Sequence, residues 1–116
     1  MKKIEAVIRQ ERLEPVKVAL EKMGILGMTV SQVSGRGRQK GITLQWRAGE
    51  YRIDLLPKIK IEIVLEDHEC QPAVETICKL AKTGKEGDGM IFVLPVDYAV
   101  RVRTNGDVDN CVAVLK

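Results

Sequence analysis

Two segments of the chain alternate apolar and polar residues with the period of a β-strand. Residues 3–9 carry Ile, Ala and Ile at every second position, and residues 58–64 carry isoleucine at three alternate positions. Successive side chains of a strand point to opposite faces, so both segments are predicted to be strands with one apolar face. Further strands are expected over residues 28–34 and 91–96, and residues 98–103 are expected to add a short final strand.

Two helices are predicted between these strands. Pro15 is typical of a first helical turn, where its missing N–H costs nothing, and an apolar stripe at helical spacing follows it. Gly24 is placed to end this helix in a left-handed cap. A second helix is expected over residues 70–81.

The order of these elements predicts an α+β protein with the ferredoxin-like split βαβ (βαββαβ) fold, in which both helices cover one face of an antiparallel sheet. Residues 60–64 faintly repeat residues 3–7, which supports two successive halves. All 116 residues are expected to form a single domain. The face of the sheet away from the helices would be largely charged, which a monomer can leave in water.

Composition describes an ordinary globular chain, with 45% apolar and 30% charged residues. One Trp, two Tyr and one Phe leave the core to aliphatic side chains. The net charge of +3 is too small to indicate nucleic acid. Neither of the two alternating strands offers an aromatic platform for RNA bases.

Several functional classes are unsupported by the sequence. Met1-Lys2-Lys3 leads directly into an alternating strand rather than a signal peptide, and no apolar run is long enough to cross a membrane. Three cysteines without C-x-x-C spacing are expected to be reduced thiols of a cytoplasmic protein. His68 has no evident nucleophile as a partner, so no enzyme activity is expected.

Two glycine-rich loops are the candidate functional segments. In residues 35–41 glycine alternates with cations, which is typical either of an anion-binding loop or of a basic hairpin tip. Residues 83–89 have the sequence Thr-Gly-Lys-Glu-Gly-Asp-Gly, which taken alone is compatible with an ordinary turn.

These motifs occur in a familiar order. Residues 37–41 (Gly-Arg-Gln-Lys-Gly), Tyr51, the Leu-Pro-Lys of residues 56–58 and the loop 83–89 together resemble the PII nitrogen-regulatory signal proteins, over residues 1 to about 104. The resemblance implies a homotrimer whose sheets face one another, a T-loop at about 37–55, a B-loop at about 83–89, and a C-terminal strand and tail over 98–116.

The resemblance also implies that ATP or ADP, with AMP as a further candidate, binds in the cleft between neighbouring subunits. Its binding residues would be Thr29, Gly35, Gly37, Arg38, Glu62, Val64, Gly87, Asp88 and Gly89, with Arg101 and Arg103 from the next subunit. The spacing of the two arginines puts both guanidinium groups on one face of a strand, which suits a polyphosphate; a solvated edge strand is the alternative.

A second implied ligand is 2-oxoglutarate. It would chelate Mg²⁺ together with the Gln39 side chain, while the backbone near Gln39, Lys40 and Gly41 and the ammonium of Lys58 neutralise its carboxylates. The T-loop would then bind an ammonium transporter or nitrogen-assimilation enzymes. Arg47 would plug the transporter pore, and Tyr51 would be either a uridylylation site or an unmodified contact.

The sequence departs from the PII pattern at several positions. Met90 stands where the family has a lysine that reaches the phosphates, which leaves the nucleotide preference open, and Arg36 replaces a phenylalanine. A different class also remains possible: a small trimeric ferredoxin-like metal-binding protein, resembling the divalent-cation tolerance family, with His68, Cys70 and Cys111 as ligands.

Overall fold

The computed structural model describes residues 1–37, 42–46, 49–53 and 55–103, of which 42–46 and 49–53 are described by their backbone. The elements follow one another as β1 (Lys2–Ile8), a 3-10 turn η1 (Gln10–Arg12), α1 (Leu13–Lys22), β2 (Thr29–Gly35), β3 (Ile42–Trp46), β4 (Gly49–Ile53), β5 (Leu56–Leu65), α2 (Asp67–Ala81) and β6 (Gly89–Pro95).

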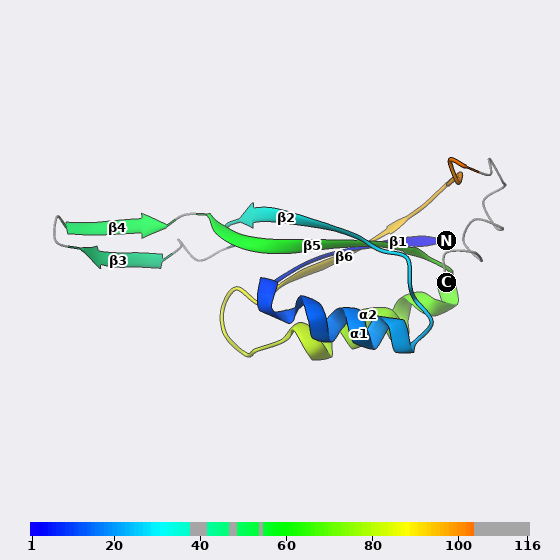
Figure 1. Ribbon diagram of the computed structural model, residues 1–116, viewed down its shortest axis with the longest axis horizontal. Coiled ribbons are helices and arrows are strands. Elements are labelled where there is room, and N and C mark those ends of the chain that lie inside the picture. The colour runs from blue at the N-terminus through cyan, green and yellow to red at the C-terminus, as the bar shows by residue number, and fades with distance from the viewer. Residues whose placement is uncertain (38–41, 47–48, 54, 104–116) are drawn as a thin grey trace.

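Four strands form one antiparallel sheet in the order β2-β5-β1-β6. Both helices lie on the same face of this sheet (Figure 1). The α+β architecture predicted from the sequence is therefore confirmed, and the strand order is consistent with the ferredoxin-like βαββαβ arrangement.

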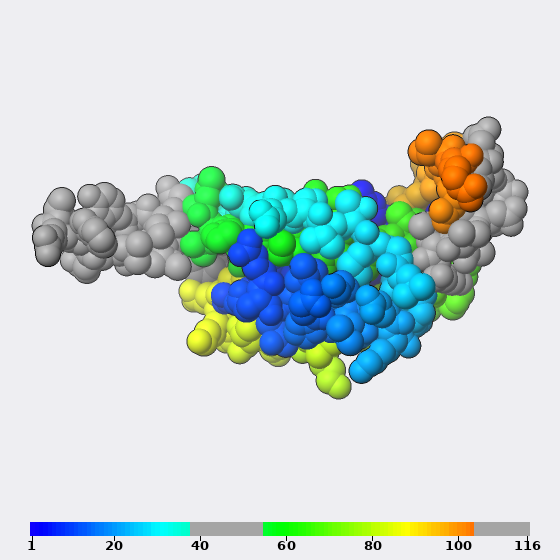
Figure 2. Space-filling view, viewed as in Figure 1, coloured from blue at the N-terminus to red at the C-terminus, as the bar shows by residue number. Residues whose placement is uncertain are grey.

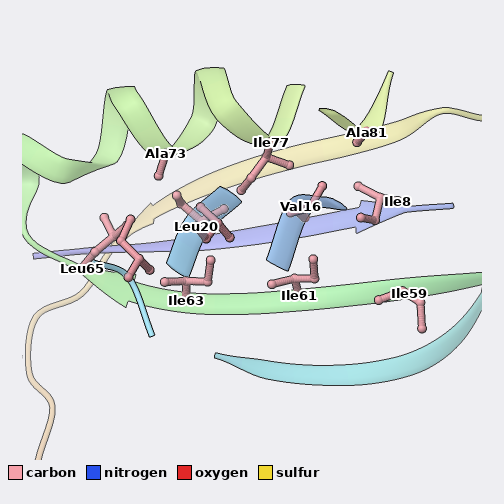
Figure 3. Close-up of a cluster of buried hydrophobic side chains, with 13 residues drawn as sticks. Ile8, Val16, Leu20, Ile59, Ile61, Ile63, Leu65, Ala73, Ile77 and Ala81 are labelled. Carbon is pink, nitrogen blue, oxygen red and sulfur yellow. The ribbon is translucent and has the colours of Figure 1, made fainter. Parts of the chain in front are cut away.

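The core lies between the sheet and the helices. In the register of β1 and β5, Ile4 is opposite Ile63 and Ile8 is opposite Ile59, so the apolar rows of the two strands share one face. Val16 and Leu20 of α1 and Ile77 of α2 pack over these rows (Figure 3). The most buried residues of the core are aliphatic, and each contributes about 1.5–3 kcal/mol by its removal from water; they are Ile4, Ile8, Val16, Leu20, Ile61, Ile63 and Ile77.

Both predicted helices form, and the second begins earlier than expected. Pro15 lies in the first turn of α1, and Gly24 follows its C-terminal end with a φ of +84°. α2 begins at Asp67 rather than at residue 70, because Glu66 and Glu69 form a capping box. In this box the backbone N–H of Glu66 donates to Glu69 Oε1 at 3.1 Å, which satisfies a donor that the helix leaves without a partner.

Residues 98–103 do not form the expected final strand. Pro95 is already opposite Lys2, the first residue of β1, and the N–H of Val96 donates to the carbonyl oxygen of Met1 at 3.2 Å. The pairing of β6 with β1 therefore ends at Pro95, the residue opposite the start of β1.

The segment between β2 and β5 contains a hairpin that the sequence pattern did not indicate. β3 and β4 pair with each other, with Leu44 opposite Tyr51. This two-stranded ribbon projects beyond the end of the four-stranded sheet (Figure 1).

The open face of the sheet, opposite the helices, is divided into a charged and an apolar half. Lys3 Nζ lies 2.7 Å from Glu62 and 3.2 Å from Glu5, and Lys60 lies 3.8 Å from Glu62. These charged side chains belong to β1 and β5, as predicted. Strand β6 adds exposed apolar side chains opposite the outward residues of β1; these are Met90, Phe92 and Leu94.

No helix in the described parts of the chain combines the length and the apolar character that a membrane crossing requires.

Candidate functional site

The two glycine-rich loops meet at Lys58, near the start of β5. The Lys58 ammonium donates a hydrogen bond to the carbonyl oxygen of Gly87. On its other side, a Cβ placed on Gly35 would lie 3.9 Å from Lys58 Cγ. Lys58 exposes only 9% of its surface. Among the described residues it is the charged side chain that is buried. The base of the first loop and the second loop therefore share one buried cation.

Arg9 adds a second cation at this junction. It follows the end of β1, and its Nε lies 3.0 Å from Asp88 Oδ1. Its Nη2 donates to the carbonyl oxygen of Glu86. In the sequence Arg9 stands out only as part of a strand pattern, because both of its partners lie more than seventy residues away along the chain.

Asp88 holds the second loop together from within. Oδ2 accepts hydrogen bonds from the backbone N–H groups of Thr83, at 2.8 Å, and Gly84, at 2.9 Å. The Thr83 hydroxyl donates to Oδ1, the same oxygen that accepts from Arg9. These donors, the Thr83 hydroxyl foremost, hold the pKa of Asp88 well below its usual range, so the carboxylate is ionised at neutral pH.

Gly87 lies where the two cations converge. Its φ of +89° belongs to the left-handed region that glycine adopts readily. A Cβ at this position would lie 3.4 Å from Lys58 Nζ and 3.5 Å from Arg9 Nη2. The backbone N–H of Asp88 closes the turn over residues 85–88, whereas that of Gly87 has no hydrogen-bond partner among the described residues. The Lys58 ammonium and this open N–H at one glycine form an arrangement suited to an anion.

The pKa of Lys58 shows that its ammonium would be stabilised by an anionic ligand. Burial lowers the pKa of Lys58, and the nearby positive charge of Arg9 lowers it further. The carboxylates of Glu11 and Asp88 raise it in part, and an anionic group beside Lys58 would further stabilise the charged form of its ammonium.

The residues expected near a nucleoside share the open face of the sheet. Thr29 is opposite Glu62 in the pairing of β2 with β5, and Val64 follows two residues later on the same face. The Glu62 carboxylate is paired with Lys3, which lowers its pKa. The structure thus brings these three residues together on a surface that continues from the junction at Lys58.

Arg101 and Arg103 are not brought to the junction. β6 leads away from the second loop for seven residues, about 20 Å at the rise of a strand. Residues 98–103, orange at the upper right of Figure 2, lie well away from residues 82–88, in yellow at the lower left of the body. Within one chain, the residues assigned to the nucleotide therefore form two separate groups.

Other expected site residues lie partly or wholly outside the described residues. Gly37 follows β2 and lies within the described range, whereas the residues assigned to the rest of the loop do not. Those outside are Arg38, Gln39, Lys40, Gly41 and Arg47. Tyr51 is placed by its backbone alone, in β4 opposite Leu44.

The sequence is similar to proteins of one known family. The sequence profile of the family described as "Nitrogen regulatory protein P-II" matches residues 1–106. The chain is 60% identical over 104 residues to "Nitrogen regulatory protein P-II 2" of Methanothermobacter thermautotrophicus, with 90% of each chain covered. The chain belongs to the P-II family.

Two further P-II relatives come from other organisms. A protein of Pyropia yezoensis is 54% identical over 105 residues, covering 90% of this chain and 94% of its own. One from Azospirillum brasilense is 53% identical over 104 residues, covering 90% and 93%. Both are named "Nitrogen regulatory protein P-II", in agreement with the family whose profile matches this chain.

The P-II assignment replaces the metal-binding alternative. Cys70 packs against the hydrophobic core, and Cys111 lies outside the described residues. His68 instead lies near two carboxylates, with its Nδ1 3.4 Å from Glu66 Oε2 and Glu69 completing the group. Both glutamates belong to the capping box at the N-terminus of α2, whose positive dipole end disfavours a cation.

Met90, the main departure from the P-II pattern, lies on the open face. It is opposite Val7 in the pairing of β1 with β6 and exposes 60% of its surface. It directly follows Gly89, so its side chain stands beside the end of the second loop.

Proposed function

We propose that this P-II protein is a homotrimeric signal protein that binds ATP or ADP, and 2-oxoglutarate with Mg²⁺, and regulates nitrogen-assimilation partners through the loop that follows β2. The observation that carries the proposal is the junction at Lys58, where Gly35 and Gly87 meet beside Arg9. Two loops that share one buried cation can respond jointly to an anionic ligand.

Phosphate binding is supported by the donors at this junction. The open backbone N–H of Gly87 adjoins the Lys58 ammonium, and Arg9 holds the loop on its other side. Charge-assisted hydrogen bonds of this kind are worth about 1.5–3 kcal/mol each. The nucleoside would extend along the open face towards Thr29 and Glu62, which are opposite each other.

A site between subunits is supported by the distance between the two groups of residues within one chain. Residues 98–103 lie away from residues 82–88 within one chain, so a second copy would have to supply the two arginines of that segment. The open face offers the surface for such a contact, because Phe92 and Leu94 expose apolar area beside the charged rows of β1 and β5. Burial of these side chains in a trimer would stabilise the assembly.

Binding of 2-oxoglutarate rests on Lys58. Its ammonium would pair with a carboxylate of the ligand, and Gln39 would hold Mg²⁺ through its side-chain oxygen. Mg²⁺ would supply the charge that brings the keto acid and the ATP phosphates together. ATP with 2-oxoglutarate would favour one shape of the loop and ADP another, and each shape would select different partners.

A complementation experiment tests the site between subunits. Arg103→Ala removes a guanidinium from one side of the cleft, and Gly87→Asp places a carboxylate on the other side. Each variant alone is expected to lose ATP binding in calorimetry. Refolded together as mixed trimers, they should regain it, because some clefts then combine the two unaltered halves.

Controls make the result decisive. Each variant is refolded alone and its mass is measured by light scattering, which should give three chains. Restored ATP binding in the mixture supports a cleft shared between subunits. No restoration in mixed trimers, or binding by monomers, contradicts it.

Partner binding is assigned to the projecting β3–β4 hairpin. Arg47 lies between the two strands in the sequence and would enter the pore of an ammonium transporter, while Tyr51 would be a contact or a uridylylation site. Arg47→Ala is expected to weaken binding to the transporter, whereas Arg52→Ala in the same hairpin serves as the matched arginine control. Equal binding by Arg47→Ala and the parent protein would show that Arg47 is not the plug.

A further inference from the structure

Asp88 has no acceptor capacity left for a ligand. An ionised carboxylate offers about four lone-pair sites. The donors that occupy them are Arg9 Nε, the Thr83 hydroxyl, and the backbone N–H groups of Thr83 and Gly84. The side chain that sequence resemblance assigns to nucleotide binding is therefore fully engaged within the protein.

The same contacts close the loop into a ring and fasten it to the sheet. Asp88 reaches back five residues to Thr83, and the Thr83 hydroxyl in turn accepts from the N–H of Lys85 at 3.2 Å. Arg9 binds both Asp88 and the Glu86 carbonyl, on either side of Gly87. Gly89 then enters β6 opposite Ile8, the residue before Arg9. The backbone of Gly87 is thus held between two fixed points.

We propose that Arg9, Thr83 and Asp88 form a clasp that positions the backbone N–H groups of the second loop for the phosphates of the nucleotide. In this arrangement Asp88 and Arg9 are positioning residues, and neither contacts Mg²⁺. The clasp rests on the proposed nucleotide site. It assigns the contact with the phosphates to the backbone near Gly87.

Preorganisation explains why such a clasp strengthens binding. A glycine-rich loop pays conformational entropy when a ligand orders it. Contacts that already fix Gly87 and its neighbours remove part of that cost before the ligand arrives. Loss of any one clasp member should therefore release the same loop, so the effects of two substitutions should not multiply.

A double-mutant cycle tests this inference, with calorimetry of ATP and AMP on Arg9→Ala, Asp88→Ala and the double variant. Each single variant should bind ATP about ten- to a hundredfold more weakly. The double variant should bind ATP only slightly more weakly than the weaker-binding single variant. The affinity for AMP should fall less than the affinity for ATP. Multiplied losses in the double variant would overturn the clasp.

The role of Mg²⁺ separates positioning from direct ligation. If Asp88 positions the loop, Asp88→Ala should weaken ATP binding by a similar factor in Mg²⁺ and in EDTA. A loss that disappears in EDTA would make Asp88 a ligand of the metal and contradict the inference.

Thr83 supplies a variant that leaves the sheet and core untouched. Thr83→Val removes the hydroxyl and should weaken ATP binding, whereas Thr83→Ser keeps it and should bind as the parent does. Amide hydrogen exchange at Gly84 should quicken in Thr83→Val and in Asp88→Ala, but not in Thr83→Ser. If Gly84 amide exchange and ATP affinity were both unchanged in Thr83→Val, the proposal would be contradicted.

The outcomes distinguish this inference from the function on which it rests. A parent protein that binds no ATP contradicts the proposed nucleotide site itself. A parent that binds ATP with an affinity unaltered by Asp88→Ala contradicts only the clasp.

Discussion

Lys58 and Gly87 are joined by a hydrogen bond from the Lys58 ammonium to the Gly87 carbonyl oxygen, across 29 residues of sequence. The bond ties the start of β5 to the loop after α2. Because Gly35 lies on the other side of Lys58, a change in the charge or contacts of this one side chain reaches both loops.

The pKa of Lys58 provides a prediction on pH. Burial and the charge of Arg9 lower it below the ordinary value of 10.5. The unfolded chain then binds more protons than the folded one between the two pKa values, so the contribution of Lys58 to folding stability rises with pH in that window. Bound 2-oxoglutarate favours the charged ammonium and should raise the pKa again.

Carbon NMR of labelled lysine measures both changes. The titration midpoint of the Lys58 ammonium should lie below pH 10.5 in the free protein and rise when ATP, Mg²⁺ and 2-oxoglutarate are added. A Lys58 midpoint that falls on ligand addition would contradict the carboxylate contact.

Alanine substitutions at Gly89 and Gly84 should lower the folding stability by different amounts. A Cβ on Gly89 would lie 1.9 Å from the Val7 carbonyl oxygen, at a φ of +119°. Gly89→Ala must therefore displace the β1–β6 pairing and should cost about 3 kcal/mol or more of unfolding free energy. Gly84→Ala has open space around its Cβ at a φ of +88°, so only the backbone cost of about 1–2 kcal/mol remains.

Urea unfolding at one protomer concentration compares the two variants. A larger loss for Gly89→Ala supports the close approach of the strands at this position. Equal losses would show that the approach is not maintained in solution.

Met90→Lys tests the main departure from the P-II pattern. A lysine at this position adds an ammonium beside the end of the second loop and should tighten ATP binding about ten- to a hundredfold, with a smaller gain for AMP. Val18→Lys adds the same charge at an exposed position of α1, on the other face of the sheet, and should not tighten ATP. Calorimetry that finds equal ATP affinities for the parent and Met90→Lys would show that position 90 does not face the phosphates.

The sequence predicted the faces of the sheet well because a period of two leaves little freedom. Once Ile4 and Ile61 are buried, their neighbours must point to the open face. The start of α2 was placed too late because the apolar stripe begins after the capping box, and glutamate at Glu66 is not a usual N-cap residue.

The site was predicted less completely, because its contacts join distant segments. Arg9 lies at the end of a strand, and nothing in its neighbourhood indicates a bond to Asp88, 79 residues later. Asp88 itself was identified through its motif, but the motif does not say whether the carboxylate binds a ligand or the loop. Only the donors around it, Thr83 and Gly84 among them, distinguish the two.

Calorimetric titration of 2-oxoglutarate is the most direct test of the central claim that the two loops form one ligand-responsive site at Lys58. We expect binding to the parent protein in the presence of ATP and Mg²⁺, much weaker binding with ADP or without nucleotide, and an affinity about ten- to a hundredfold lower in Lys58→Met. Binding that is equally tight without nucleotide, or unchanged in Lys58→Met, would contradict it.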